Sequence, residues 1–142
     1  MQPAVRSFFL RSYTDWGLLL LRVFIGSFML FAHGLSKLTG FSEKMTTFAD
    51  PIGLGPQFSL ALSVFAEVFC AGAIILGLLT RLALIPLIIN MLVITLIVHA
   101  DDPWGKKEFA LLFAVPFLTL LLTGPGRFSL DAFLFNRAPA RQ

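Results

Sequence analysis

Long apolar stretches alternate with short polar stretches along this chain. Four of the apolar stretches are long enough to span a membrane, since about 20 mostly apolar residues cross roughly 30 Å of hydrocarbon. They cover residues 16–36, 57–79, 81–99 and 107–123. The second and third spans meet at Leu79-Thr80-Arg81 and must form a tight antiparallel hairpin. The pattern therefore predicts an all-α protein, an integral membrane four-helix bundle.

Two short amphipathic helices are predicted outside the spans. In the first loop, Ser42 can cap a helix that runs through Asp50 and is ended by Pro51. After the fourth span, Gly124-Pro125-Gly126 breaks the helix and Ser129 can start another one. We expect both helices to lie in the membrane interface.

Composition supports a single membrane domain over residues 1–142. Of the 142 residues, 57% are hydrophobic and 13% are charged, and the mean hydropathy is +0.85. Soluble domains average about 25% charged residues. The net charge of +3 comes from scattered basic residues, which fits a lipid bilayer as partner and argues against nucleic acid. Cys70 is the only cysteine, which excludes an intramolecular disulfide and a Cys-x-x-Cys relay within the chain.

The basic residues also predict an orientation. In the four-span arrangement one side carries only arginines: Arg6, Arg11, Arg81, Arg127, Arg137 and Arg141. The other side carries only lysines: Lys37, Lys44, Lys106 and Lys107. Because basic residues favour the cytoplasmic side, this six-to-four bias predicts an integral cell membrane protein with both termini in the cytoplasm.

Six ionisable residues lie within the apolar stretches or at their ends: Arg22, His33, Lys37, Glu67, His99 and Glu108. A charge in hydrocarbon costs a few kcal/mol, so such residues are candidates for a functional site. Helical spacing and depth predict an Arg22–Glu67 pair near the midplane. His33, His99 and Glu108 are expected to line a cup that opens outward, with Lys37 at its rim. Asn90 is expected to face away from His99 and to make a different contact.

Structural roles are also open for these residues. The Arg22–Glu67 pair could fix the helix register, and Lys37 could extend to the interface. His99 and Glu108 could be ordinary polar residues at span ends.

Several motifs resemble the DoxX family of small four-helix membrane proteins. The tail Gly124-Pro125-Gly126-Arg127-Phe128-Ser129-Leu130-Asp131-Ala132 is similar to the family's characteristic ending. Leu21-Arg22-Val23 and the segment His33-Gly34-Leu35-Ser36-Lys37-Leu38 resemble its first-helix pattern. Glu67 and Glu108 fit its polar positions. The resemblance covers roughly residues 17–135.

The resemblance implies a quinone-linked oxidoreductase subunit or membrane anchor. The family takes its name from a subunit linked to thiosulfate:quinone oxidoreductase, and members are associated with quinone resistance and oxidative stress. A quinone head needs donors for its carbonyls and a route for protons. The cofactor-binding set is then Arg22, His33, Lys37 and His99, and the catalytic set is His33, Glu67, His99 and Glu108.

The chain has no dinucleotide fingerprint and no haem-type spacing, so a redox reaction needs electrons from a partner protein or the bound molecule. Two alternatives to the quinone-linked function remain open. In the first alternative, His33, His99, Glu67 and Glu108 bind a metal ion within the membrane. In the second, the chain is a non-catalytic membrane interaction protein.

Overall fold

The computed structural model describes residues 13–135, and these residues form helices and no strands. In chain order the elements are α2 (Thr14–Phe28), η1 (Met29–Gly34), α3 (Leu35–Thr39), α4 (Phe41–Lys44), α5 (Pro56–Val64), η2 (Phe65–Cys70), α6 (Ala71–Leu76), α7 (Thr80–Val93), η3 (Ile94–Val98), α8 (Trp104–Thr123) and α9 (Leu130–Phe135). The elements labelled η are π-helical segments, each continuous with the α-helix before it.

Three continuous helices are long and apolar enough to cross a membrane. They are Thr14–Thr39, Pro56–Leu76 and Thr80–Val98. These agree with the first three predicted spans to within three residues at each end. The remaining long helix, α8, has 20 residues and carries Lys106, Lys107 and Glu108 near its start. The all-α prediction is therefore confirmed within residues 13–135, and the membrane spans are confirmed for three helices.

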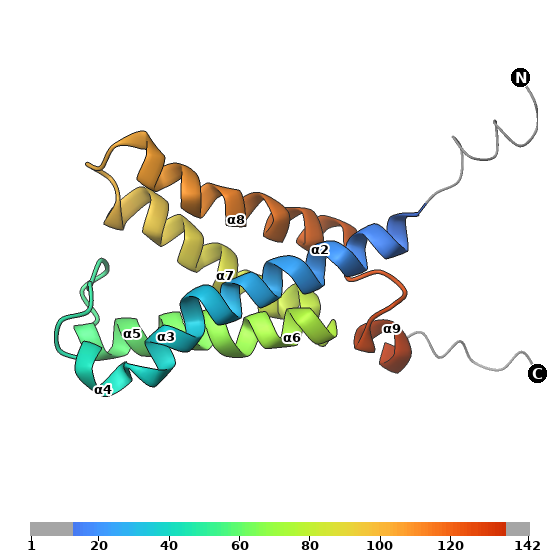
Figure 1. Cartoon of the computed structure of the whole chain (residues 1–142), viewed down its shortest axis with the longest axis horizontal. Helices are drawn as coiled ribbons and strands as arrows, with labels where there is room; N and C mark the ends of the chain where they lie inside the picture. The colour runs from blue at the N-terminus through green and yellow to red at the C-terminus, as the bar shows by residue number, and fades with distance from the viewer. Residues whose placement is uncertain (1–12, 136–142) are drawn as a thin grey trace, which may run out of the picture.

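The long helices run alternately between two ends of the molecule (Figure 1). The tail end holds the turn between α6 and α7 together with the segment 124–135. The loop end holds the loops 40–55 and 99–103. The start of α2 and the helix α9 both lie at the tail end (Figure 1).

The interior is apolar and closely packed where the long helices meet. Among the fully buried side chains are Met29, Leu60, Ile74, Leu84, Leu87, Phe117 and Leu120. Large apolar side chains also cover the outside of the helices, and Leu20, Leu96 and Leu122 are among the most exposed. Such a surface suits hydrocarbon as the solvent. In lipid, packing between helices depends on close approach, which small residues permit.

The turn between α6 and α7 is anchored by the tail. Gly77 has φ +69°, and the amides of Gly77 and Leu78 donate to the carbonyls of Ile74 and Ala73, which closes the end of α6. The carboxylate of Asp131 accepts the amides of Leu79 at 2.6 Å and Thr80 at 2.9 Å. These amides lie at the start of α7, so Asp131 caps this helix from a distant part of the chain.

The two predicted short helices have different outcomes. The helix predicted from Ser42 through Asp50 is wrong over most of its length, because α4 covers only Phe41–Lys44. Asp50 instead accepts hydrogen bonds from residues that follow it, which holds the chain in a turn. The second helix is confirmed as α9, and Ser129 Oγ caps it by accepting the amide of Ala132 at 3.1 Å. Arg6, Arg11, Arg137 and Arg141, used to predict the orientation, lie outside the described residues.

Candidate functional site

A polar cluster surrounds Glu67 in the interior of the loop-end half. Lys37 Nζ lies 2.5 Å from Glu67 Oε1 and 2.6 Å from Oε2. Ser63 Oγ donates to Oε1 at 3.1 Å, and Asn90 Nδ2 donates to the same oxygen at 2.9 Å. We call these four residues the Glu67 cluster. They come from α3, α5, η2 and α7, so three distant parts of the chain meet at one carboxylate.

A close helix contact brings these residues together. Gly34 packs directly on the backbone of η2, and a Cβ built at Gly34 would lie 2.5 Å from the carbonyl oxygen of Glu67. Only a residue without a side chain permits this approach. Lys37 lies about one turn beyond Gly34, which places its ammonium group over Glu67. The contact of η1 with η2 therefore determines the geometry of the cluster.

A pocket of about 500 Å³ lies beside the Glu67 cluster. Its polar lining comes from Lys37, Ser59, Ser63, Asn90 and His99. Its apolar lining comes from Phe48, Pro51, Ile52, Leu62, Phe65, Pro86, Ile89, Val93, Ile94 and Val98, together with Ala49. Leu62, Phe65 and Ile89 are exposed on the apolar outer surface, so the pocket borders the region that lipid would occupy. This size and mixture of lining groups is typical of small-molecule sites.

The loop 48–52 forms one wall of this pocket and is held in place by Asp50. The carboxylate of Asp50 accepts the amides of Leu54 at 2.9 Å and Gly55 at 2.8 Å, and the hydroxyl of Ser59 at 2.8 Å. The hydrogen bond from Ser59, aided by the two amides, lowers the pKa of Asp50 from its ordinary value of 3.8. The Phe48 ring centre lies 5.9 Å from Lys37 Nζ, within the range of a cation–π contact.

A second polar group lies at the loop-end edge of the pocket. His99 Nδ1 lies 2.7 Å from Asp102 Oδ2, and Lys106 Nζ donates to Asp102 Oδ1 at 2.9 Å. Hydrogen bonds from His99 and then Lys106 lower the pKa of Asp102. His99 lines the pocket and Lys106 is exposed, so this group extends from the pocket to the outer surface at the loop end.

The predicted Arg22–Glu67 pair is wrong. Arg22 is buried, but its Nη1 donates to the carbonyl of Pro125 at 3.0 Å and its Nη2 to that of Phe128 at 2.6 Å. These partners belong to the tail, which folds back against α2 in a way that helical spacing does not reveal. Arg22 therefore lies outside the pocket and fastens the tail to the first helix.

The placement predicted for Lys37 is also wrong. Lys37 was expected at the rim and is instead the charge partner of Glu67. Asn90 makes a different contact from His99, as predicted, because Asn90 donates to Glu67 while His99 contacts Asp102, yet both residues line the same pocket. The π-helical segment η3 lies between them and turns the chain less per residue than an α-helix, which changes their relative direction. The signal available in the sequence was a polar residue, Asn90, within an apolar span. Uniform helical spacing placed its side chain on the wrong face of the helix.

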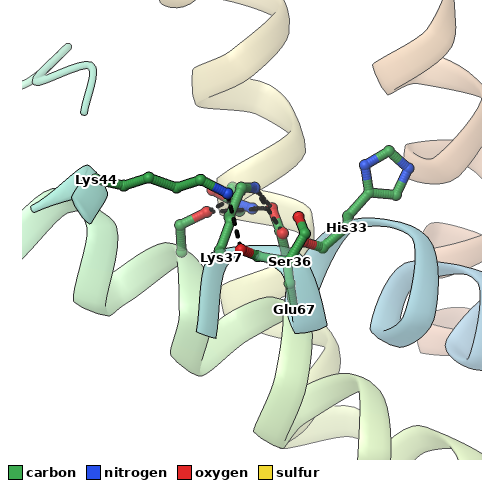
Figure 2. Close-up of polar contacts among 7 residues, drawn as sticks. His33, Ser36, Lys37, Lys44 and Glu67 are labelled. Atoms are coloured by element: carbon green, nitrogen blue, oxygen red, sulfur yellow. Dashed lines mark hydrogen bonds and ion pairs between the residues drawn. The ribbon is translucent and has the colours of Figure 1, made fainter. Parts of the chain in front are cut away.

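His33 and Glu108 lie apart from the Glu67 cluster. Figure 2 shows the His33 ring directed away from Lys37 and Glu67. Its ring centre lies 5.7 Å from that of Phe109 and 5.4 Å from that of Phe113, both on α8. Glu108 is exposed near the start of α8. The expected cup of His33, His99 and Glu108 is thus absent, and His99 is the one of these three that lines the pocket.

The metal alternative depended on convergence of His33, His99, Glu67 and Glu108. Within residues 13–135, no three His, Cys, Asp or Glu side chains are grouped so that they could hold a metal ion. The buried Cys70 packs in the core among apolar side chains. The described part of the chain therefore offers no observation in favour of a metal centre.

The apolar helices and the buried polar cluster define a small all-helical membrane protein. The chain belongs to the DoxX family, whose sequence profile matches residues 17–100. It is 33% identical over 124 residues to an uncharacterized membrane protein of Mycobacterium tuberculosis, covering 70% of this chain and 76% of the relative. It is also 33% identical over 121 residues to the Bacillus subtilis protein named "Putative oxidoreductase CatD", covering 84% of this chain and 88% of that protein.

A third relative is an uncharacterized protein of Haemophilus influenzae. It is 29% identical over 132 residues, with 87% of each chain covered. No solved structure shows a significant match to this chain. The resemblance inferred from the tail and first-span motifs is therefore confirmed at the level of the family.

Proposed function

We propose that this DoxX protein binds a quinone in the pocket beside the Glu67 cluster, as a subunit or membrane anchor of a quinone-linked oxidoreductase. The observation that carries the proposal is the pocket itself, which joins hydrogen-bond donors to apolar walls that border the lipid region. A relative over 84% of this chain is named as an oxidoreductase, which supports a redox role.

The donors of the pocket suit a carbonyl group. An ammonium group has three protons and an amide nitrogen has two. Lys37 directs its three protons to the two carboxylate oxygens of Glu67 and to Ser63 Oγ, whereas Asn90 uses one of its two protons on Glu67 and keeps the other available. Asn90 lines the pocket, so its second proton is the donor available to one carbonyl oxygen of a quinone. His99, at the loop-end edge, directs Nδ1 to Asp102, so its uncharged ring offers Nε2 as an acceptor for a hydroxyl group of the reduced quinone.

A redox reaction of the bound quinone needs electrons from elsewhere. The chain has one cysteine, and no three metal-ligating side chains group together in residues 13–135. The electrons would therefore come from a membrane or peripheral partner protein. His99, Asp102 and Lys106 are then the groups through which protons reach the pocket from water.

We also propose that α8 forms the fourth span and that both termini lie in the cytoplasm. The support is that the start of α2 and the helix α9 lie at the same end of the molecule (Figure 1). Four crossings place both ends of a chain on the same side of the membrane. The bias of basic residues predicts that this side is the cytoplasm. A single cysteine at exposed Ser42 should react with an impermeant maleimide in intact cells, whereas one at exposed Leu130 should react only after permeabilisation. Labelling of Leu130→Cys in intact cells contradicts this orientation.

Direct binding tests the quinone proposal. The purified protein in phosphatidylcholine nanodiscs should bind menadione saturably in equilibrium dialysis. Asn90→Leu should weaken binding by about tenfold, the effect of losing about 1.4 kcal/mol. Thr119→Val on the exposed side of α8, outside the pocket, should leave it unchanged. Absence of saturable binding, or equal binding by Asn90→Leu and the unchanged protein, rules the proposal out.

A further inference from the structure

A lysine in a pocket that borders lipid presents a problem of selectivity. Membranes are rich in anionic amphiphiles, and a free ammonium group at the end of an apolar slot is a site for their head groups. The ammonium group of Lys37 is not free in this way. Both carboxylate oxygens of Glu67 lie within hydrogen-bond distance of it, at 2.5 Å and 2.6 Å.

Glu67 neutralises Lys37 from behind the pocket wall. The side chain of Glu67 is 1% exposed, whereas that of Lys37 is 20% exposed. Lys37, Ser63 and Asn90 line the pocket, and Glu67 is not among the lining residues. A ligand therefore meets the donors of the Glu67 cluster without meeting a net positive charge.

Two carboxylates near the pocket oppose the entry of an anion, and the ammonium group of Lys44, beside Lys37, donates to the carbonyl of Ser36 at 2.8 Å (Figure 2). Asp50, which holds the loop 48–52, contributes a negative charge near the pocket. At the loop-end edge, the carboxylate of Asp102 lies between His99 and Lys106, so a neutral His99 leaves this group balanced. An anionic head group in the pocket would meet an ammonium group that is already paired with a carboxylate, so it would lose its hydration without gaining an unpaired cation in exchange.

We infer that Glu67 is a specificity-determining residue, which keeps the pocket neutral so that it accepts uncharged hydrogen-bond acceptors and excludes anions of the same shape. This inference rests on the proposed function for the identity of the pocket as a ligand site. It extends that function by naming the chemical class of ligand. An uncharged carbonyl compound belongs to the accepted class, whereas fatty carboxylates and lipid phosphates belong to the excluded class.

A matched pair of ligands isolates the effect of charge. Decanesulfonamide and decanesulfonate have the same chain and nearly the same head, but only the sulfonate is an anion at neutral pH. In phosphatidylcholine nanodiscs the unchanged protein should bind the sulfonamide at least about tenfold more tightly, as measured by calorimetry. Equal affinity for the two ligands, or tighter binding of the sulfonate, overturns the inference.

Substitution of Glu67 should change this preference. Glu67→Gln leaves the charge of Lys37 uncompensated, so the affinity ratio should move by about tenfold or more toward the sulfonate. The double variant Lys37→Gln/Glu67→Gln has no charge in the cluster and should keep the preference for the sulfonamide. A Glu67→Gln protein that folds, judged by size-exclusion chromatography, and keeps the original ratio contradicts the inference.

Asp50→Asn provides a variant outside the membrane interior in case Glu67→Gln does not fold. It removes one negative charge near the pocket and should move the ratio severalfold toward the sulfonate, and no change counts against the inference. The ligand pair also separates this inference from the quinone proposal. If menadione does not bind but the ratio follows the charge of Glu67, the proposed function fails and the inference stands.

Discussion

Lys37 and Glu67 form an ion pair between the first and second long helices, with the ammonium nitrogen 2.5 Å and 2.6 Å from the two carboxylate oxygens. Glu67 is 1% exposed and receives further hydrogen bonds from Ser63 and Asn90. A carboxylate with these partners is the point at which three helices become fixed relative to one another. The pair therefore has consequences for stability as well as for ligand binding.

Removal of one partner of this pair should destabilise the folded protein more than removal of both. Lys37→Met leaves a buried carboxylate without its counter-charge, which should lower the free energy of unfolding by about 3 kcal/mol. Lys37→Met/Glu67→Leu removes both charges and should recover much of this loss. Unfolding in detergent by added denaturant measures the difference. Additive losses in the double variant would show that the two side chains do not interact.

Gly34 should be intolerant of any side chain. A Cβ at this position would lie 2.5 Å from the carbonyl oxygen of Glu67, so Gly34→Ala must separate η1 from η2 at a cost of about 1–3 kcal/mol. Gly72→Ala is the matched control, because a Cβ there meets no atom within 4 Å. Thermal unfolding in detergent should show a lower midpoint for Gly34→Ala alone. Equal midpoints for the two variants contradict the close contact.

Arg22 should hold the tail against the first helix. Arg22→Met removes hydrogen bonds to the carbonyls of Pro125 and Phe128, and bonds to a charged group contribute about 1.5–3 kcal/mol each. Amide hydrogen exchange in residues 124–129 should then become faster. Leu20→Met, at an exposed position of the same helix, should leave this exchange unchanged. Equal exchange in all three proteins would mean that the tail is held by other contacts.

The turn at Asp50 should persist to low pH. The pKa of Asp50 is lowered in the folded protein, so its ionised form contributes stability at pH values above the ordinary carboxyl value of 3.8. This contribution is lost as the pH falls through the lowered folded value. The Gly55 amide resonance, followed by NMR, should therefore titrate with a midpoint below 3.8, and Asp50→Asn should abolish this titration. A midpoint above 3.8 contradicts the lowered pKa.

His33 should be replaceable by phenylalanine. Its Nε2 is buried and has no hydrogen-bond partner among the described residues, and its ring packs against Phe109 and Phe113. Replacement of an unsatisfied polar ring by an apolar one should leave the unfolding midpoint unchanged or raise it. Menadione binding should also persist in His33→Phe, because His33 does not line the pocket. Loss of binding with an intact fold would restore His33 to the site.

The helical class and the first three spans could be predicted from the sequence because lipid requires every backbone group to be satisfied within the span. A run of about 20 apolar residues therefore has few alternatives to a helix. The α9 helix was also predictable, since Gly124-Pro125-Gly126 and the capping Ser129 act locally. The loop helix through Asp50 failed because Asp50 bonds forward to Leu54 and Gly55.

The candidate site was predictable only in part. The charges in apolar stretches identified Lys37, Glu67 and His99, which lie in or around the pocket. Their partners were misassigned, because contacts between helices and with the tail do not follow from a uniform angle per residue within each helix. The π-helical segments η1, η2 and η3 interrupt that regularity in each of the three spans. A π-helical turn contains more residues than an α-helical turn and so changes the face on which later residues lie.

The sequence by itself determined which segments enter the membrane and which residues are costly to place there, because both depend on local hydropathy and charge. Only the tertiary structure decided which charges meet. Lys37 pairs with Glu67 because Gly34 lets η1 approach η2, and Arg22 turns to the tail because Pro125 and Phe128 present carbonyl groups to it. These partners lie 30 to 106 positions apart, and such long-range contacts arise from helix packing rather than from sequence spacing.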